Sequence, residues 1–507
     1  MTLSLFIFLP CLGVIALAFL PRSLNLRPWI QAFSLGLFLY SLTLLSRFNI
    51  FTPDFQFQEF LPWLAPIGLS YHLGVDGLSL PLVVLTTFIT WIAFLCTPET
   101  IDRPRLYYSL MLFASAGLIG ALVAQNLLLF FLFYELELLP FFLLISIWGG
   151  DRRQYAAYKF LIYTAISGIL ILLAFFGLNW FTGATSFDYS AIDTSSLSWR
   201  TKLILLTFLL VGFGIKIPLV PLHTWQPDAY VEASPAVAMM LGGVLAKLGA
   251  YGLIRFGFQL FPDTWGLVSP GLAIVGSLSV LYGSLTAIAQ KDIKRMVAYS
   301  SIGHMGYILV AAAAGTELSL LGTIAQMIAH GLILALLFYL VGIVEAKTGT
   351  RDLDHLNGLM NSVRGLPLIS GLLVLAGMAS AGIPGLVGFS AEILVFQGSF
   401  SRFPIPTIVC ILSSGLTAVY FVILINRTCF GRLNNQLAYY GVVSGSEQLP
   451  ALILTIAILF LGLQPQWLIH WTESTTTPMI AQIRSFNPPP VEPFESFEPF
   501  EQLAFRS

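Results

Sequence analysis

Long apolar runs separated by short polar segments recur along almost the whole chain. A run of about 20 apolar residues is long enough to cross a bilayer as a helix, and about fourteen such runs are present. This pattern predicts an all-α polytopic membrane protein. The predicted spans are residues 3–20, 28–46, 77–96, 107–124, 126–147, 159–180, 201–223, 234–259, 268–288, 295–314, 318–345, 364–400, 405–428 and 449–470.

Two of these spans are predicted to be broken. Pro218 and Pro221 follow Lys216 closely, and proline removes a backbone donor and clashes with the preceding turn. The run 364–400 is too long for one straight crossing and contains Pro384 among three glycines. We therefore expect helix breaks near 216 and 384. Broken helices beside buried charges form ion sites in many transporters.

The spacing of the two breaks, five spans, suggests a five-helix unit used twice. An odd number of spans inverts the second copy, as in many transporters. The expected parts are an N-terminal three-helix segment (1–106), a first inverted repeat (107–259), a second inverted repeat (268–428), and a last transmembrane helix with an extended C-terminal tail (429–507).

The composition agrees with a membrane protein. Of the 507 residues, 57% are hydrophobic and 10% are charged, which excludes an ordinary soluble domain. The net charge of −1 gives no indication of nucleic-acid binding, which usually requires a strongly basic surface. The four cysteines are scattered and form no CxxC pair, so we expect no disulfide and no zinc or iron–sulfur site in this chain. The first span lacks a basic n-region, which favours a retained helix over a signal peptide.

Lysine and arginine placement predicts the orientation. With the N-terminus outside, fifteen of these residues fall in inside loops and six in outside loops, while Lys216, Lys247 and Arg255 lie within spans. Positive residues favour the cytoplasmic side of a membrane. Both termini are therefore predicted outside, in the periplasm or the thylakoid lumen.

Glutamates and lysines lie inside predicted spans, where each charge costs about 2.5–3.5 kcal/mol on insertion scales. Glu135 and Glu137 are mid-span and about 200° apart on a helix, so only one of them can face a given partner. A glutamate opposite Lys216 keeps both groups charged, and separating them would make a proton switch. The alternative is a static ion pair that fixes helix packing.

Further ionisable residues continue this series. Lys247 and His330 are mid-span, His304 lies in an apolar segment, and Glu392 follows the second break. Imidazole relays protons well, although a structural role for His304 stays open. Gly331 is expected to mark a local irregularity beside His330. Glu135, Lys216, Lys247, His330 and Glu392 would then form a polar line along the membrane midplane.

Other polar residues are weaker candidates. His223, Asp228 and Glu232 follow the first break and either gate proton uptake or cap and solvate an inside bend; we favour the solvated bend. Asp76 precedes the third span and is expected to cap the start of that helix.

Six sequence motifs lie in order along residues 70–430. They are GVDGLSLPL, FYELELLP, KIPLVPLHTWQPDAYVEASPAVAMMLGGVLAKLGAYG, DIKRMVAYSSIGHMGY, QMIAHG and GIPGLVGFSAE. Over this range the chain resembles the antiporter-like membrane subunits of respiratory complex I (NDH-1), of the NuoM/NdhD (chain 4) type. Within that type it looks like the NdhD of cyanobacteria and chloroplasts.

The resemblance implies a fourteen-helix fold with two inverted five-helix repeats and a proton pathway. It implies Glu135 and Lys216 as the first pair, Lys247 and His330 as the central relay, and Glu392 as the exit. Glutamate rather than lysine at position 392 favours the NuoM/NdhD type. Glu137 is an additional acid, so which carboxylate faces Lys216 stays open.

The resemblance also implies partners and a location. The chain itself is expected to hold no cofactor. Quinone (plastoquinone), NAD(P)H or ferredoxin, and iron–sulfur clusters would belong to hydrophilic electron-transfer subunits, and NdhB and NdhF types would be its membrane-arm neighbours. The expected location is a thylakoid membrane, in a complex for respiration, cyclic electron flow or carbon dioxide uptake. A subunit of a multisubunit cation/proton antiporter is the alternative function.

Overall fold

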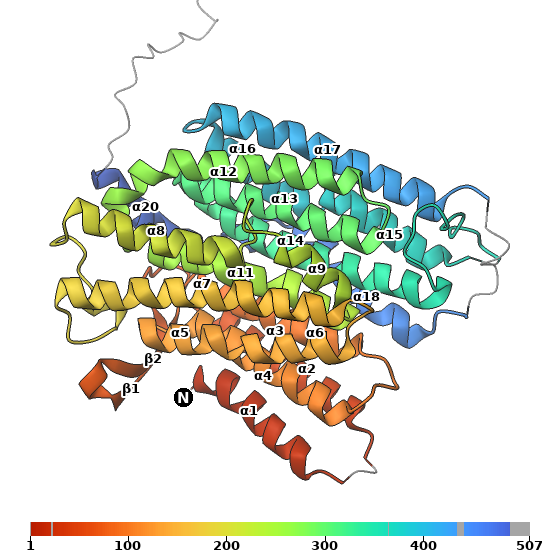
Figure 1. Ribbon diagram of the computed structural model, residues 1–507, viewed down its shortest axis with the longest axis horizontal. Helices are drawn as coiled ribbons and strands as arrows, with labels where there is room; N and C mark the ends of the chain where they lie inside the picture. The colour runs from red at the N-terminus through yellow and green to blue at the C-terminus, as the bar shows by residue number, and fades with distance from the viewer. Residues whose placement is uncertain (1, 22–23, 364, 433–440, 487–507) are drawn as a thin grey trace, which may run out of the picture.

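The computed structural model describes residues 2–21, 24–363, 365–432 and 441–486. Its helices run roughly side by side in one bundle (Figure 1). Ten of the described helices are long and apolar enough to cross a membrane, and four more apolar helices have 10–17 residues. The chain is therefore an all-α, multi-pass integral membrane protein, as predicted.

Most of the helices follow the predicted spans within a few residues. Four consecutive segments, α10, η3, α11 and η4, form one helix whose η3 and η4 turns are π-helical. The main helices are α1 (Ser4–Phe19), α2 (Leu26–Arg47), α3 (Ser79–Leu95), α4 (Pro104–Val123), α5 (Leu127–Leu136), α6 (Leu138–Trp148), α7 (Arg153–Thr182), α8 (Trp199–Lys216), α9 (Trp225–Glu232), α10 (Pro235–Met240), η3 (Leu241–Leu245), α11 (Ala246–Gly252), η4 (Leu253–Phe258), α12 (Pro262–Ile288), α13 (Ile293–Ala314), α14 (Glu317–Thr348), α15 (Pro367–Ser380), α16 (Val387–Phe400), α17 (Pro404–Cys429) and α18 (Gly445–Leu463).

Local sequence signals explain where these helices start. The Asn126 side chain accepts hydrogen bonds from the backbone at the start of α5, and Ser198 and Asp292 do the same for α8 and α13. Such caps satisfy donors that a helix leaves free at its N-terminus. Proline is the first residue of five of the described α-helices, a position where its missing N–H leaves no helical hydrogen bond unmade. These are α4, α10, α12, α15 and α17.

The helices at the centre of the bundle are buried, and those at its periphery expose apolar side chains suited to contact with lipid. The apolar part of α14 is buried throughout, whereas α7 and α17 expose large apolar side chains such as Ile169 and Leu412. Within a membrane, close contact between helices depends on small residues. A Cβ on Gly283 of α12 would lie 2.7 Å from the backbone nitrogen of Gly303 on α13. Glycine is therefore required at this crossing.

A β-hairpin between α2 and α3 was not predicted. Strands β1 (Gln56–Leu64) and β2 (Leu69–Val75) pair antiparallel. Asp188, from the α7–α8 connection, accepts hydrogen bonds from Ser70 and Asn126 and lies 3.4 Å from His72 Nδ1. Burial alone would raise the pKa of Asp188, but these donors and Ser186 outweigh it, so its pKa lies below the ordinary value. The contacts of the Asp188 carboxylate thus hold the hairpin against the helix bundle.

Two helices that were not predicted as separate elements follow the last long helix. After α18 come α19 (Gln466–Ile469) and α20 (Glu473–Phe486), and α20 lies at the same end of the bundle as the hairpin (Figure 1). Thr475 Oγ1 of α20 accepts a hydrogen bond of 2.8 Å from the Gly77 backbone nitrogen. We call this end the hairpin end. The stretch expected to be extended, 487–507, lies outside the described residues.

Candidate functional site: buried ionisable residues across the bundle

The first predicted helix break is present. Helix α8 ends at Lys216, and α9 begins at Trp225. The segment between them contains Pro218 and Pro221, which cannot donate backbone hydrogen bonds. The Trp225 indole nitrogen donates to the Ile215 carbonyl at 2.8 Å, satisfying one carbonyl that the break exposes. Lys216 therefore lies at a helix C-terminus, where the helix dipole favours a positive charge.

Lys216 forms a buried ion pair with Glu137. Its Nζ donates to Glu137 Oε1, and the two side chains are 1% and 0% exposed. The Nζ atom also lies 4.3 Å from the centre of the Tyr134 ring, whose hydroxyl is 3.0 Å from Ser167 Oγ. Glu137 Oε2 has no hydrogen-bond partner among the described residues. The pair is fully buried, and the described residues satisfy only one oxygen of its carboxylate.

The structure places Glu137, not Glu135, on Lys216. The predicted span 126–147 is two helices, α5 and α6, and Glu137 lies at their junction. Glu135 faces α7 instead, where a Cβ on Gly168 would lie 2.1 Å from its Oε1. Glu135 and Lys216 form no ion pair within the described parts of the chain. The sequence left this choice open because both carboxylates occupy the same short segment.

Lys247 is buried without a carboxylate partner. It is 1% exposed, and its Nζ donates to the Gly242 carbonyl in the π-helical turn η3. A π turn leaves backbone groups outside the regular helical ladder, so Gly242 can accept from a side chain. No carboxylate of the described residues lies within ion-pair distance of Lys247. A Cβ on Gly249, two residues further on, would lie 3.0 Å from Lys216 Cβ. The helix of Lys247 therefore touches the end of α8.

The same helix crosses α14 close to His330. A Cβ on Gly331 would lie 2.8 Å from the Gly243 carbonyl oxygen, so the two backbones are in contact. Lys247 and His330 each lie within about one helical turn of this crossing. The irregularity expected at Gly331 is wrong, because α14 runs unbroken through it. Glycine is needed there for the close approach instead.

His330 and His304 stack on each other in the second half of the bundle. Their ring centres are 5.0 Å apart, with 27° between the ring planes. His304 Nε2 lies 2.9 Å from Ser380 Oγ, and its Nδ1 lies 3.8 Å from Glu392 Oε1. Both ring nitrogens of His330 are buried and have no hydrogen-bond partner among the described residues.

Glu392 lies just after the second break, which is also present as predicted. Helix α15 ends at Ser380 and α16 begins at Val387. Gly382, in the break, has φ +70°, and a Cβ there would lie 2.8 Å from Glu392 Oε2. That oxygen accepts a hydrogen bond of 3.0 Å from Ser414 on α17. Glu392 is 3% exposed, and its Oε1 has no hydrogen-bond partner in the described structure.

These buried ionisable residues lie in three separate groups, so the continuous polar line stays a prediction. The Glu137–Lys216 pair forms the first, Lys247 the second, and the set of His330, His304 and Glu392 the third. No hydrogen bond joins one group directly to the next within the described residues. The helix crossings at Gly249 and Gly331 bring the groups close. Buried polar atoms are commonly bridged by water, and the free nitrogens of His330 are suited to such bridges.

Comparison with known proteins identifies the family. The family model "NADH:quinone oxidoreductase/Mrp antiporter, TM" matches residues 124–417. The NAD(P)H-quinone oxidoreductase chain 4 of Acaryochloris marina is 36% identical over 497 residues, covering 95% of this chain and 92% of that protein. A second chain 4 protein, from Thermosynechococcus vestitus, is 38% identical over 444 residues, covering 86% and 83%. The chain belongs to the chain 4 branch of this family.

Chains of solved membrane complexes share this fold. Respiratory complex I from Thermus thermophilus contains a chain 26% identical, with a TM-score of 0.84 and coverage of 95% of this chain and 100% of that one. A chain of the Mrp complex from Dietzia sp. shares the fold at 21% identity, with a TM-score of 0.85 and coverage of 96% and 98%.

The bend after the first break is only partly solvated: Asp228 and Glu232 are half-buried, and Glu232 Oε2 accepts a hydrogen bond from the Arg152 backbone nitrogen at 2.9 Å. Residues 225–232 form the helix α9, and His223 is buried with its ring 4.8 Å from that of Tyr282. Asp228 pairs with Lys159 at 2.8 Å and with Arg295 at 3.0 Å. Two cations on neighbouring helices pair with this carboxylate, which is 18% exposed, and so tie α9 to the bundle.

One buried ion pair was missed by the sequence analysis. Asp76 Oδ1 accepts from the Ser79 backbone nitrogen at 3.0 Å, which confirms its role at the start of α3. Asp76 Oδ2 also pairs with Arg255 Nη2 at 2.6 Å, and both side chains are almost fully buried. The sequence could have predicted this pair from Arg255, because an arginine within a membrane span usually has an acidic partner.

Proposed function

We propose that this chain carries protons as a membrane-arm subunit of a quinone-reducing, complex I-type enzyme. The buried Lys216–Glu137 pair is the observation that supports this most strongly. A buried lysine keeps its proton while a carboxylate is beside it and releases the proton when the carboxylate moves away. The free second oxygen of Glu137 gives that carboxylate an alternative contact to form.

The remaining buried groups supply the proposed route. A proton released by Lys216 passes to Lys247, whose own lack of a carboxylate partner favours onward release. The stacked pair of His330 and His304 then relays it towards Glu392. Ser414 orients the Glu392 carboxylate, which is the proposed exit group. Glu135, beside the first pair, is a second acceptor for Lys216.

We further propose that the chain contains the two inverted repeats expected from the sequence, 107–259 and 268–428. Each contains one broken helix, α8/α9 in the first and α15/α16 in the second. Lys216 ends the first half-helix of one repeat, and Glu392 lies in the second half-helix of the other. The hairpin end would then face the periplasm or the thylakoid lumen.

The electron-transfer chemistry would belong to other subunits. The names of the relatives support NAD(P)H as the electron donor and quinone as the acceptor. Ferredoxin as an alternative donor, and iron–sulfur clusters in hydrophilic partners, are proposed from the motif resemblance alone. NdhB and NdhF types are the proposed membrane-arm neighbours, in a thylakoid membrane. The role of this chain is to couple that reaction to proton movement.

Purification from native membranes tests the proposal against the antiporter alternative. An affinity-tagged chain solubilised in mild detergent should bring down hydrophilic iron–sulfur subunits, and the preparation should reduce plastoquinone. A protein tagged on an unrelated membrane subunit controls for carry-over. A stable assembly made only of membrane subunits, with no iron–sulfur signal in electron paramagnetic resonance, would instead favour a cation/proton antiporter.

A further inference from the structure

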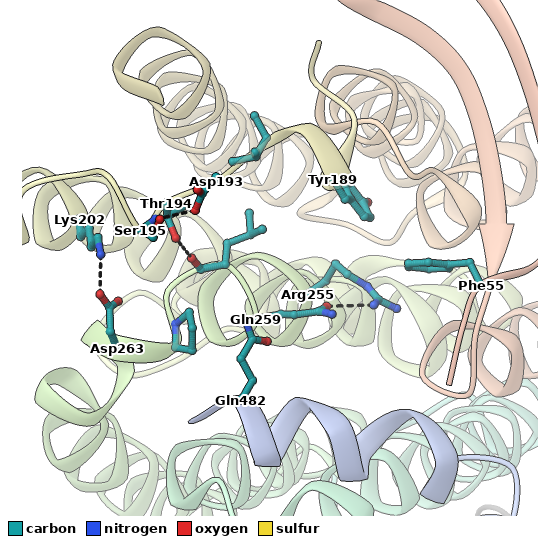
Figure 2. Close-up of a pocket in the computed structure, with 13 residues that line it drawn as sticks. Phe55, Tyr189, Asp193, Thr194, Ser195, Lys202, Arg255, Gln259, Asp263 and Gln482 are labelled. Atoms are coloured by element: carbon teal, nitrogen blue, oxygen red, sulfur yellow. Dashed lines mark hydrogen bonds and ion pairs between the residues drawn. The ribbon is translucent and has the colours of Figure 1, made fainter. Parts of the chain in front are cut away.

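A polar cavity opens at the hairpin end, away from the proposed proton route. Its volume is about 350 Å³. The α7–α8 connection forms its rim with the exposed residues Asp193 and Ser195, and α20 contributes Gln482. Figure 2 shows the Lys202–Asp263 pair at one end of this cavity and Arg255 beside Phe55 at the other. Water can therefore reach the side chain of an otherwise buried arginine.

Arg255 is fixed on several sides. Its Nη1 donates to Gln259 at 3.0 Å and its Nη2 to Asp76 at 2.6 Å. The guanidinium carbon lies 4.9 Å from the ring centre of Phe55 and 5.4 Å from that of Tyr251. A second cavity of about 310 Å³ reaches the same Asp76–Arg255 pair beside α20. Arg255 thus borders both cavities, and Asp76 borders the second.

Lys247 lies deeper on the same helix. It is eight residues from Arg255, or about 12 Å along a helix. Tyr251 lies midway, and its hydroxyl donates to the Leu122 carbonyl at 3.2 Å. Leu122 and Lys247 both line a small internal cavity of about 10 Å³, close to the size of one water molecule. Only a short path therefore separates the cavity at the hairpin end from the proposed route.

The Asp76–Arg255 pair is chemically unsuited to relay protons. Arginine keeps its proton in proteins, unlike lysine or histidine. Asp76 is saturated with donors, because Oδ1 accepts from the backbone nitrogens of Leu78 and Ser79 and from the Ser79 hydroxyl, and Oδ2 accepts from Arg255. Arg255 Nε has no hydrogen-bond partner among the described residues, but a guanidinium N–H only donates and cannot accept a passing proton. Arginine plays a comparable excluding part in water-conducting pores.

We propose that the Asp76–Arg255 pair is a proton-tight plug that closes the first half of the bundle at the hairpin end. It keeps protons of that compartment from reaching Lys247 and returning along the route. The plug rests on the proposed function, because a leak requires that Lys247 exchange protons. The plug adds to the proton route a barrier against proton entry from the hairpin end.

The test is passive proton leak through the assembled complex, without electron transfer. Vesicles containing the complex receive an imposed pH gradient, and an internal dye follows its decay. The double variant Asp76→Asn/Arg255→Gln removes both charges, so that no lone buried charge remains. It should leak protons several-fold faster than the parent, and adding Lys247→Ala should restore the parent rate. The control Lys202→Gln/Asp263→Asn removes the other ion pair of the same cavity and should stay tight.

A parent-like leak rate in Asp76→Asn/Arg255→Gln would overturn the plug, whatever the outcome of pumping experiments. Cysteine labelling tests independently whether solvent from the hairpin side passes the Asp76–Arg255 pair. It keeps the native pair, so it can be done even if the double variant does not assemble. In a background without the four native cysteines, a membrane-impermeant thiol reagent added from the hairpin side should modify Leu260→Cys, which lines the cavity. Leu248→Cys, beside Lys247, should stay protected. Modification of Leu248→Cys at a similar rate would also overturn the proposal.

Discussion

Replacing Lys216 by alanine should abolish proton pumping through this chain while the complex still assembles. The substitution leaves Glu137 buried without its partner, and an uncompensated buried charge costs about 3–5 kcal/mol. Glu137 will therefore take up a proton and become neutral, and no charged pair is left to be separated. The measurement is proton uptake into vesicles at matched rates of electron transfer.

Lys202→Ala is the matched control for this variant. Lys202 is also a buried lysine of α8 with an acidic partner, Asp263, but it lies at the hairpin end, and Asp263 is 31% exposed. Water can solvate that carboxylate, so pumping should be close to the parent value. Undiminished pumping in Lys216→Ala would reject the proposed function and leave the ion pair with a packing role only.

Substituting Glu135 and Glu137 by glutamine should have very different effects on proton pumping. Glu137→Gln removes the carboxylate that contacts Lys216 and should reduce pumping almost as far as Lys216→Ala does. Glu135→Gln removes a group that faces Gly168 of α7 and should leave a clearly larger fraction of pumping. Glutamine matches glutamate in size, so the comparison isolates the charge.

The comparison uses the number of protons taken up per electron transferred, measured on complexes with equal subunit content. Heat stability of the assembled complexes controls for misfolding. If Glu135→Gln lost pumping and Glu137→Gln kept it, the carboxylate that serves Lys216 during turnover would be Glu135, and the observed pair would be a resting contact.

Much of the fold follows from local pattern. Apolar runs fix helices because each backbone group inside a membrane must be satisfied within its own segment. Pro218 and Pro384 mark both broken helices for the same local reason, the loss of a backbone donor. The hairpin escaped prediction because β1 contains Pro62 and lacks a clean alternation of apolar and polar residues.

Contacts between distant segments could not be predicted in this way. The choice between Glu135 and Glu137 depends on the junction of α5 and α6, which lies within one apolar run. The Asp76–Arg255 pair joins residues far apart in the sequence, and only the packing of α3 against the helix of Arg255 brings them together. Lys216, Lys247, His330 and Glu392 were found because a charge inside an apolar span is conspicuous on its own.

The most direct test of a single proton route compares two variants that each interrupt it at a different point. Lys216→Ala breaks the first half and Glu392→Gln the second, and the number of protons taken up per electron is measured for each and for the double variant. If all protons of this chain pass both residues in series, each single variant should lower that number to the same value, and the double variant should lower it no further. Losses that add together, or a single variant with the parent ratio, would contradict a continuous route through these buried groups.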